Sequence, residues 1–130
     1  MKQSPQRPTP AELEILNVLW SRGPATVREV HDDLGSTRDT GYTTVLKLLQ
    51  IMAEKGLVAR DESARAHVYR PVVEESATQT LMVRELLDRA FGGSAAKMVM
   101  QALSTRPSTP EEIAGIRKLL DEMETTGGKR

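Results

Sequence analysis

Apolar positions in the first half of the chain recur at helical spacing in three segments separated by glycine and proline. The segments cover residues 9–22, 26–35 and 42–55, and the first two open with a Thr-x-x-Glu capping box. Gly56 follows the third segment, where a left-handed residue often ends a helix. We therefore expect three helices with buried stripes, which are Leu13, Leu16 and Trp20 (widened by Ile15 and Leu19), then Val27, Val30 and Leu34, then Val45, Leu48, Leu49 and Met52.

The next two apolar runs are short, which is typical of strands. They are "LVAR" at 57–60 and "HVYRPV" at 67–72, and the polar connector "DESARA" between them lacks the Asn-Gly or Gly-Gly pair of a tight hairpin. Three helices followed by a loose two-stranded hairpin is the element order of a winged helix-turn-helix. The predicted fold class is mainly α with a small β-hairpin: a winged-helix DNA-binding domain over residues 9–73, preceded by a disordered tail at residues 1–8.

From residue 74 onward the pattern predicts three more helices, broken by two glycines and by the linker "STRPSTP". These short helices have few large side chains, and a small winged unit buries only about 60% of its unfolded surface. Packing against the same helices of a second subunit would bury their stripes; the alternative is that they fold back onto their own winged unit. We predict a helical dimerisation region over 74–124 and a disordered tail at 125–130. The residues expected in the homodimer interface are Val83, Leu86, Leu87, Met98, Val99, Leu103, Ile113, Ile116, Leu120 and Met123.

Charge and composition narrow the possible functions. The chain has 18 basic and 18 acidic residues, and residues 1–73 hold ten basic against nine acidic ones. A net charge of +1 cannot drive strong non-specific DNA binding, so two subunits on a palindrome would be needed. Without cysteine, disulfides and thiolate metal sites are excluded, and neither a signal peptide nor a membrane-spanning run is recognisable. We expect a cytoplasmic protein with no cofactor, no metal site and no membrane insertion.

The outward face of the third predicted helix carries the candidate chemistry. Thr43, Lys47 and Gln50 lie at i, i+4 and i+7 and form one ridge when the apolar stripe faces inward. A B-form major groove admits one helix, in which threonine can touch phosphate or a thymine methyl, and lysine and glutamine can reach base edges. We therefore expect this ridge, together with Thr44, to contact double-stranded operator DNA. Nearby contacts are expected from Arg38, Tyr42, Arg60, Arg65 and His67.

Three other functions fit less well. An enzyme is disfavoured because His31 and His67 are the only histidines and lie on different predicted elements, with no nucleophile–base pairing. His31 beside Asp32 and Asp33 is better explained as a polar surface than as a metal site. RNA binding by base stacking is disfavoured by the presence of only one tryptophan, two tyrosines and one phenylalanine. A winged-helix protein-interaction module without sequence-specific DNA binding suits the low net charge and stays open.

Several longer motifs resemble the penicillinase and methicillin-resistance repressor family of bacteria. They are "AELEILNVLW", "GPATVREVHDDL", "YTTVLKLLQIMAEKGLVAR", "AHVYRPV" and "FGGSAAKMV", and the likeness extends from about Thr9 to Glu122. The resemblance implies a homodimeric winged-helix repressor that dimerises through its C-terminal helices and binds a short inverted repeat upstream of resistance or stress genes. It also implies DNA-reading positions at Thr43, Thr44 and Lys47, with Arg65 in the wing, and a membrane sensor protease or a downstream protease as a partner.

The chain departs from the family pattern in three respects. Ile51 and Glu54 stand where members often have arginine and lysine, which reduces the positive charge of the third helix. Members induced by β-lactams are commonly cut between an asparagine and a phenylalanine, and the matching pair here is Gln101–Ala102, which argues against that route. Copper-sensing relatives bind metal through C-terminal cysteines, which this chain lacks.

Overall fold

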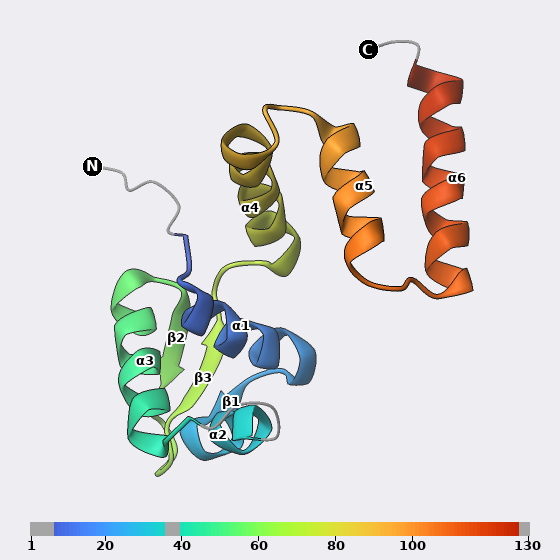
Figure 1. Cartoon of the computed structure of the whole chain (residues 1–130). Coiled ribbons are helices and arrows are strands. Elements are labelled where there is room, and N and C mark those ends of the chain that lie inside the picture. The colour runs from blue at the N-terminus through green and yellow to red at the C-terminus, as the bar shows by residue number, and fades with distance from the viewer. Residues whose placement is uncertain (1–6, 36–39, 128–130) are drawn as a thin grey trace. The chain divides into compact units, whose positions relative to one another are not determined.

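The computed structural model describes residues 7–35 and 40–127 (Figure 1). Most of the predicted N-terminal tail, together with Arg38, therefore lies outside the described residues. The chain divides into two compact units, Met1–Arg84 and Glu85–Arg130. The division falls inside helix α4 (Glu75–Ala90), later than the expected boundary at residue 73, so one helix contributes to both units.

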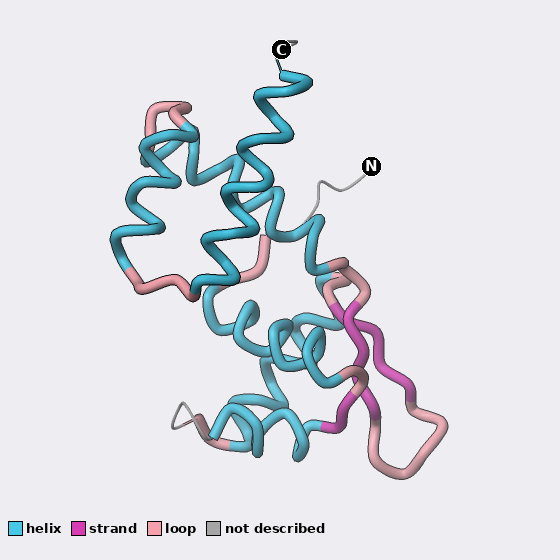
Figure 2. The backbone as a smooth tube through the Cα atoms, turned by 90° about the vertical axis from the view of Figure 1, so that its right-hand side faces the viewer, coloured by secondary structure: helices cyan, strands magenta, loops and turns pink. Residues whose placement is uncertain are grey.

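Before α4, the described part of the first unit contains three helices and a small antiparallel sheet. The helices are α1 (Pro10–Arg22), α2 (Val27–Gly35) and α3 (Tyr42–Lys55), and the strands are β1 (Ala25–Thr26), β2 (Val58–Asp61) and β3 (Val68–Pro71). Figure 2 shows β2 and β3 as neighbouring strands joined by an open loop, which is the wing. The predicted class, a winged helix-turn-helix followed by further helices, is confirmed.

The sheet has three strands instead of the two that the sequence predicted. Its order is β1-β3-β2, and the short β1 pairs with β3 through Ala25 opposite Tyr69 and Thr26 opposite Val68. The sequence could not reveal β1 because two residues are too few to show alternation of apolar and polar side chains. In addition, Thr26 reads as the residue that caps α2. The base of the wing is therefore joined directly to the start of the second helix.

Local capping signals set the helix ends as predicted. Thr9 and Glu12 form a reciprocal capping box at α1, and Thr26 and Glu29 form another at α2. At the end of α3, Gly56 has a φ of 83°, and the next amide donates to the Met52 carbonyl at 2.9 Å. This is the Schellman arrangement, which turns the chain from α3 into β2.

The core of the first unit lies where the three helices meet the sheet. In α1 the fully buried residues are Ile15, Leu16 and Leu19, whereas the predicted Leu13 and Trp20 are only partly buried, so the apolar stripe is centred differently from the prediction. Trp20 instead lies at the edge of the core, and its indole Nε1 donates to the Val73 carbonyl at 3.1 Å. The whole core comprises Ile15, Leu16, Leu19, Ala25, Val27, Val30, Leu34, Val45, Leu49, Met52, Leu57, Val58 and Tyr69.

A largely buried ion pair joins the start of α1 to the end of α3. The Glu12 side chain is 3% exposed, and the Lys55 ammonium donates to its two oxygens at 2.8 and 2.9 Å. The same carboxylate accepts from the Thr9 amide at 3.0 Å as part of the capping box. Glu12 therefore fixes the start of α1 and the end of α3 together, a role that its sequence context showed only in part.

The second unit contains the rest of α4 with α5 (Ala95–Thr105) and α6 (Pro110–Gly127). Ser94 caps α5, and Thr109 and Glu112 repeat the capping box at α6. The expected end of the helical region at residue 124 was too early, because α6 continues to Gly127. The Thr125 and Thr126 hydroxyls bond to carbonyls one turn back, which satisfies them within the helix.

Candidate nucleic-acid interface

The two faces of α3 have opposite environments. Val45, Leu49 and Met52 are completely buried, and Leu48 is partly buried against the core, so the predicted stripe does face inward. On the opposite side Thr43, Lys47 and Gln50 are exposed, as the helical spacing requires. The exposed residues Thr43, Lys47, Gln50 and Glu54 form one line along the helix, and we call it the α3 ridge.

The far end of the α3 ridge lacks positive charge. Glu54, one turn after Gln50, places a carboxylate on it, and the neighbouring Ile51 is an exposed apolar residue. Lys47 forms no ion pair with the residues that the structure describes, so its ammonium can meet a negatively charged partner. The part of the α3 ridge from Thr43 to Gln50 therefore carries the side chains suited to DNA.

Thr44 lies away from the ridge, on the side of α3 that faces α1. It lines a surface cavity of about 320 Å³ between α1, α2 and α3. The lining residues are Pro10, Ala11, Glu14, Leu34, Thr40, Thr44 and Leu48. The predicted grouping of Thr44 with Thr43 thus joins residues from two different sides of the helix.

Tyr42, the first residue of α3, packs against α2. The Arg28 guanidinium carbon lies 5.7 Å from the centre of the tyrosine ring, and the His31 ring meets it edge-on at 6.0 Å and 72°. The sequence interpretation singled out Tyr42 but not its neighbour Arg28. A usable signal was present: the Thr26 capping box places Arg28 in the first turn of α2, and the first helix of a helix-turn-helix crosses the DNA backbone. His31, which the sequence suggested only as a polar residue of the helix surface, lies against the tyrosine ring.

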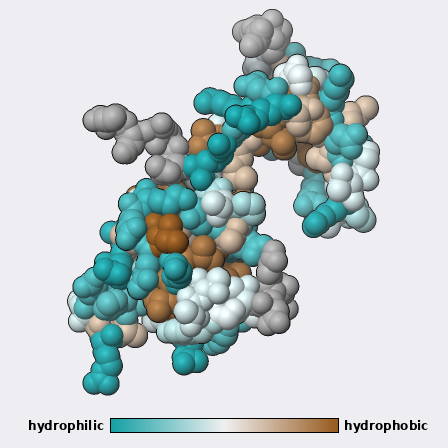
Figure 3. Space-filling model, turned by 60° about the vertical axis from the view of Figure 1, so that its left-hand side comes forward, coloured by the Kyte–Doolittle hydropathy of each residue, from teal (hydrophilic) through white to brown (hydrophobic). Residues whose placement is uncertain are grey.

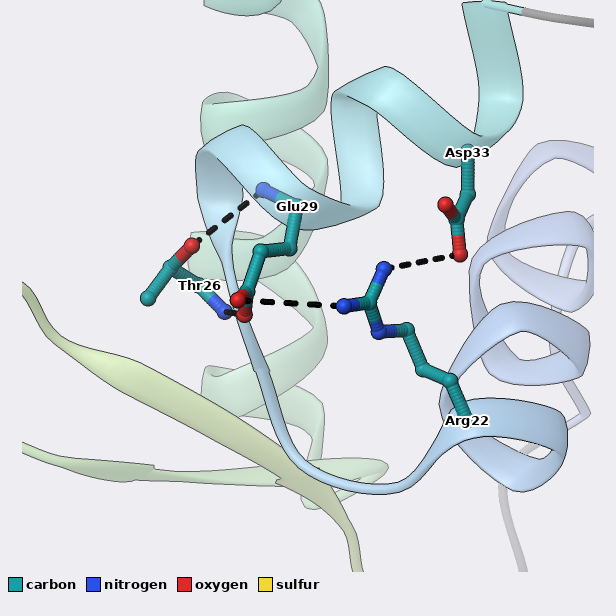
Figure 4. A network of polar contacts seen from close by, with 4 residues as sticks. All are labelled: Arg22, Thr26, Glu29 and Asp33. Carbon is teal, nitrogen blue, oxygen red and sulfur yellow. Dashed lines mark hydrogen bonds and ion pairs between the residues drawn. The ribbon is translucent and has the colours of Figure 1, made fainter.

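An arginine from α1 binds two acidic residues of α2. Figure 4 shows Arg22 between Glu29 and Asp33. The N···O distances from its guanidinium are 3.7 Å to Glu29 and 3.0 Å to Asp33. Glu29 simultaneously serves the Thr26 capping box. These contacts hold two carboxylates of α2 against an arginine of α1.

The wing offers fewer cations than the sequence suggested. Arg60 is ion-paired with Glu62 at 2.7 Å, and a hydrogen bond with Tyr69, followed by the Glu62 charge, raises the pKa of its guanidinium. Arg60 lies directly opposite Tyr69 in the sheet register, so the two side chains share a face. Arg60 is therefore engaged by Glu62 and Tyr69 on the sheet, and its expected contact with DNA stays a prediction.

The tip of the wing starts with a local turn. The Ser63 amide donates to the Asp61 carboxylate at 2.9 Å, and this bond is the main reason that the pKa of Asp61 is lowered. Arg65 and His67 follow in the loop and are exposed. They remain the wing residues that can approach a duplex.

The predicted interface residues of α4–α6 lie at the surface of a single chain. Leu87, Met98, Ile113 and Ile116 are partly buried, and the exposed ones are Val83, Leu86, Val99, Leu103, Leu120 and Met123. Figure 3 shows apolar side chains, in brown, reaching the surface of these helices. Gln101 and Ala102, which match the cleavage position of the family, are exposed within α5.

The described residues contain neither a metal-binding cluster nor a membrane-spanning helix. Within residues 7–35 and 40–127, no three His, Asp or Glu side chains are grouped so as to hold a metal ion. Across that same part of the chain, no helix combines the length and apolar character needed to cross a bilayer.

A winged helix-turn-helix with a polar α3 ridge defines the class: a DNA-binding transcriptional regulator. The family description "Penicillinase repressor" matches residues 8–122, and the chain belongs to this family. The transcriptional regulator BlaI of Mycobacterium tuberculosis is 36% identical over 121 residues, which cover 92% of this chain and 86% of the relative. The penicillinase repressor of Bacillus licheniformis is 29% identical over 122 residues, 94% of each chain.

A solved structure agrees with the winged part of the fold. The DNA-binding domain of the repressor BlaI matches with a TM-score of 0.50 and 32% sequence identity, and the match covers 58% of this chain and 92% of that domain. The resemblance seen in the sequence motifs is thereby confirmed, as is the prediction that the chain is a transcriptional repressor and not an enzyme.

Proposed function

We propose that this repressor acts as a homodimer on a short inverted repeat, with one α3 in each of two major grooves and the wings beside them. The observation that carries the proposal is the α3 ridge: Thr43, Lys47 and Gln50 are exposed on a helix whose opposite face is completely buried. A groove about 12 Å wide accepts such a helix, and these side-chain types suit base edges and phosphates.

The second unit supports the dimeric part of the proposal. None of its described residues, from Glu85 to Thr126, is buried within the single chain. Exposed apolar side chains nevertheless recur along α5 and α6, among them Leu103, Leu120 and Met123. Helices with apolar stripes and no core gain stability when a second copy covers them, and a two-fold dimer presents the same surface twice.

Dimerisation also offsets the weak charge of each winged unit. Arg60 is paired with Glu62, and Glu54 opposes phosphate at the end of the α3 ridge, so a single unit offers few cations. Two units joined in one molecule bind two half-sites together, which raises affinity without new contacts. Half-sites about 34 Å apart, one turn of DNA, would match the two recognition helices.

The test begins with selection of duplexes from a random library by the full-length protein. Fluorescence anisotropy then measures binding of the selected duplex and a scrambled one over a range of salt concentrations. Lys47→Ala should weaken binding of the selected duplex about tenfold or more, because one good base contact contributes about 1–3 kcal/mol of discrimination.

The matched control is Lys97→Ala, which removes the same charge from α5. It should leave binding close to the wild-type value. Failure to enrich any duplex, or equal binding of all duplexes, would refute operator binding and favour a protein-interaction module. Dissociation of the dimer by Lys47→Ala would show that the α3 ridge is a subunit contact.

A further inference from the structure

We propose that Arg28 contacts a DNA phosphate and that Tyr42 is the positioning residue that holds the Arg28 guanidinium toward the duplex. The inference rests on the proposed function, since it requires α3 to enter a groove with α2 beside the sugar–phosphate backbone. It adds a contact from α2 to those expected from the α3 ridge and the wing. Neither residue is part of the α3 ridge.

The geometry of the aromatic cluster supports this assignment. Arg28 is exposed and its guanidinium carbon stands 5.7 Å from the centre of the Tyr42 ring, within the range of a cation–π contact. The His31 ring lies against the tyrosine ring in a T-shaped arrangement, with the ring centres 6.0 Å apart. Tyr42 is 42% exposed, so the ring is a surface platform and not a core residue. The pair therefore places a positive charge at the junction of α2 and α3.

The acidic residues of α2 contact groups other than Arg28, which leaves the Arg28 guanidinium available for an anion. Glu29 and Asp33, one turn apart, are both engaged by Arg22 on the α1 side of the helix. Arg28 has no ion pair within the described residues, although Asp32 is one turn away on the same helix. Asp32 instead lies 3.8 Å from the His31 ring nitrogen Nδ1. The Arg28 guanidinium thus keeps its donors available for an anion while it lies against the Tyr42 ring.

Arginine held against a ring suits a phosphate. A guanidinium presents a planar fork of donors that matches phosphate oxygens, and it can stack on an aromatic face while it donates from its edge. Because the ring restricts the side chain before DNA arrives, less conformational entropy is lost on binding. The first helix of a helix-turn-helix crosses the backbone beside the groove that the second helix enters, which brings the start of α2 near phosphates.

Salt dependence of binding separates a phosphate contact from a base contact. The experiment uses the full-length protein, the selected operator and a scrambled duplex. Each lost phosphate contact lowers the slope of log K against log salt by about 0.9, so Arg28→Gln, present twice in a dimer, should lower it by about 1.8. From about 50 to about 200 mM salt, the variant would then lose about twelvefold less affinity than wild type. The change should appear on both duplexes.

A double-mutant cycle tests the role of Tyr42. Tyr42→Leu removes the ring and should weaken binding severalfold, and the conservative Tyr42→Phe, which keeps the ring, should recover most of that loss. In the Arg28→Gln background, Tyr42→Leu should have no further effect, because its action passes through Arg28. Arg106→Ala, a loss of one exposed cation outside the winged unit, is the matched control and should leave the slope unchanged.

Several results would overturn the inference. An unchanged slope in Arg28→Gln, or a loss confined to the selected operator, would show that Arg28 does not bind phosphate. Equal effects of Tyr42→Leu in both backgrounds would show that the tyrosine does not act through Arg28. Failure of the wild-type protein to select any duplex would instead refute the proposed function, so the two failures are distinguishable. Circular dichroism melting of each variant confirms that the comparison is made between folded proteins.

Discussion

Glu12 has two structural roles that depend on one charge. It completes the capping box of α1 and binds Lys55 at the end of α3, with almost no exposure to solvent. A carboxylate buried this deeply needs its partner, because removal of one member of a buried pair leaves an uncompensated charge. Lys55, at 27% side-chain exposure, keeps access to water and is the less dependent member.

We predict that Lys55→Met destabilises the protein by about 2 kcal/mol, less than the penalty for a fully buried pair because Lys55 is partly hydrated. Glu12→Gln keeps a side-chain oxygen for the Thr9 amide and removes the charge. Combined with Lys55→Met, it should recover at least about 1 kcal/mol of the loss. Urea unfolding of the single and double variants measures this coupling. Additive losses would show that the ion pair does not contribute.

The sequence reveals contacts between residues that are close in the chain, but it does not reveal contacts between different helices. The Thr9–Glu12 box spans three positions and follows from the pattern alone. The Glu12–Lys55 and Arg28–Tyr42 contacts join different helices, so they depend on how the helices pack. The position of Arg60 opposite Tyr69 in the sheet likewise has no local signal in the sequence.

At the scale of elements, α3 is the most predictable part of the chain because two independent signals agree. Its apolar stripe has helical spacing, and Gly56 stops it in the left-handed conformation, with φ at 83°. β1 was missed because it exists only through pairing with β3, more than forty residues later in the chain. Short elements that depend on distant partners give no periodic signal.

We predict that Gly56→Ala destabilises the protein by about 1–2 kcal/mol, which is the cost of a left-handed backbone for a residue with a Cβ. No atom lies within 4 Å of the position that the Cβ would take, so a steric clash does not add to this cost. Gly35→Ala is the matched control: its site is equally open and its φ is not positive, so its stability should stay the same or rise. Thermal unfolding distinguishes the two. Equal effects would show that the cap does not require glycine.

At the scale of the whole molecule, the two units differ in how far they can stand alone. The winged unit has a continuous core, whereas the described part of the second unit has no buried residue. A helix pattern in the sequence shows which side is apolar but not what covers it. The proposed subunit interface therefore stays a prediction, based on exposed residues such as Leu120 and Met123.

We predict that Leu120→Glu combined with Met123→Glu shifts the protein from dimer to monomer in sedimentation velocity, because four carboxylates would be brought into an apolar two-fold interface. Operator affinity should fall at least about tenfold as the second half-site is lost. Lys118→Glu also adds negative charge to α6 but lies outside the predicted stripe, and it should leave the dimer intact. A dimer that survives the double substitution would exclude this interface.

Thr26 links the two parts of the winged unit that flank α3. It pairs with Val68 at the base of the wing and also caps α2, two residues before Arg28. Displacement of Val68 at the base of the wing would therefore disturb the first turn of α2, so the wing and α2 are mechanically coupled through Thr26. A change in the length of the 62–67 loop, by contrast, would alter how far the wing reaches without disturbing the contacts of Thr26. The proposed DNA contacts of the wing can therefore vary through the length of this loop while those of α2 stay the same.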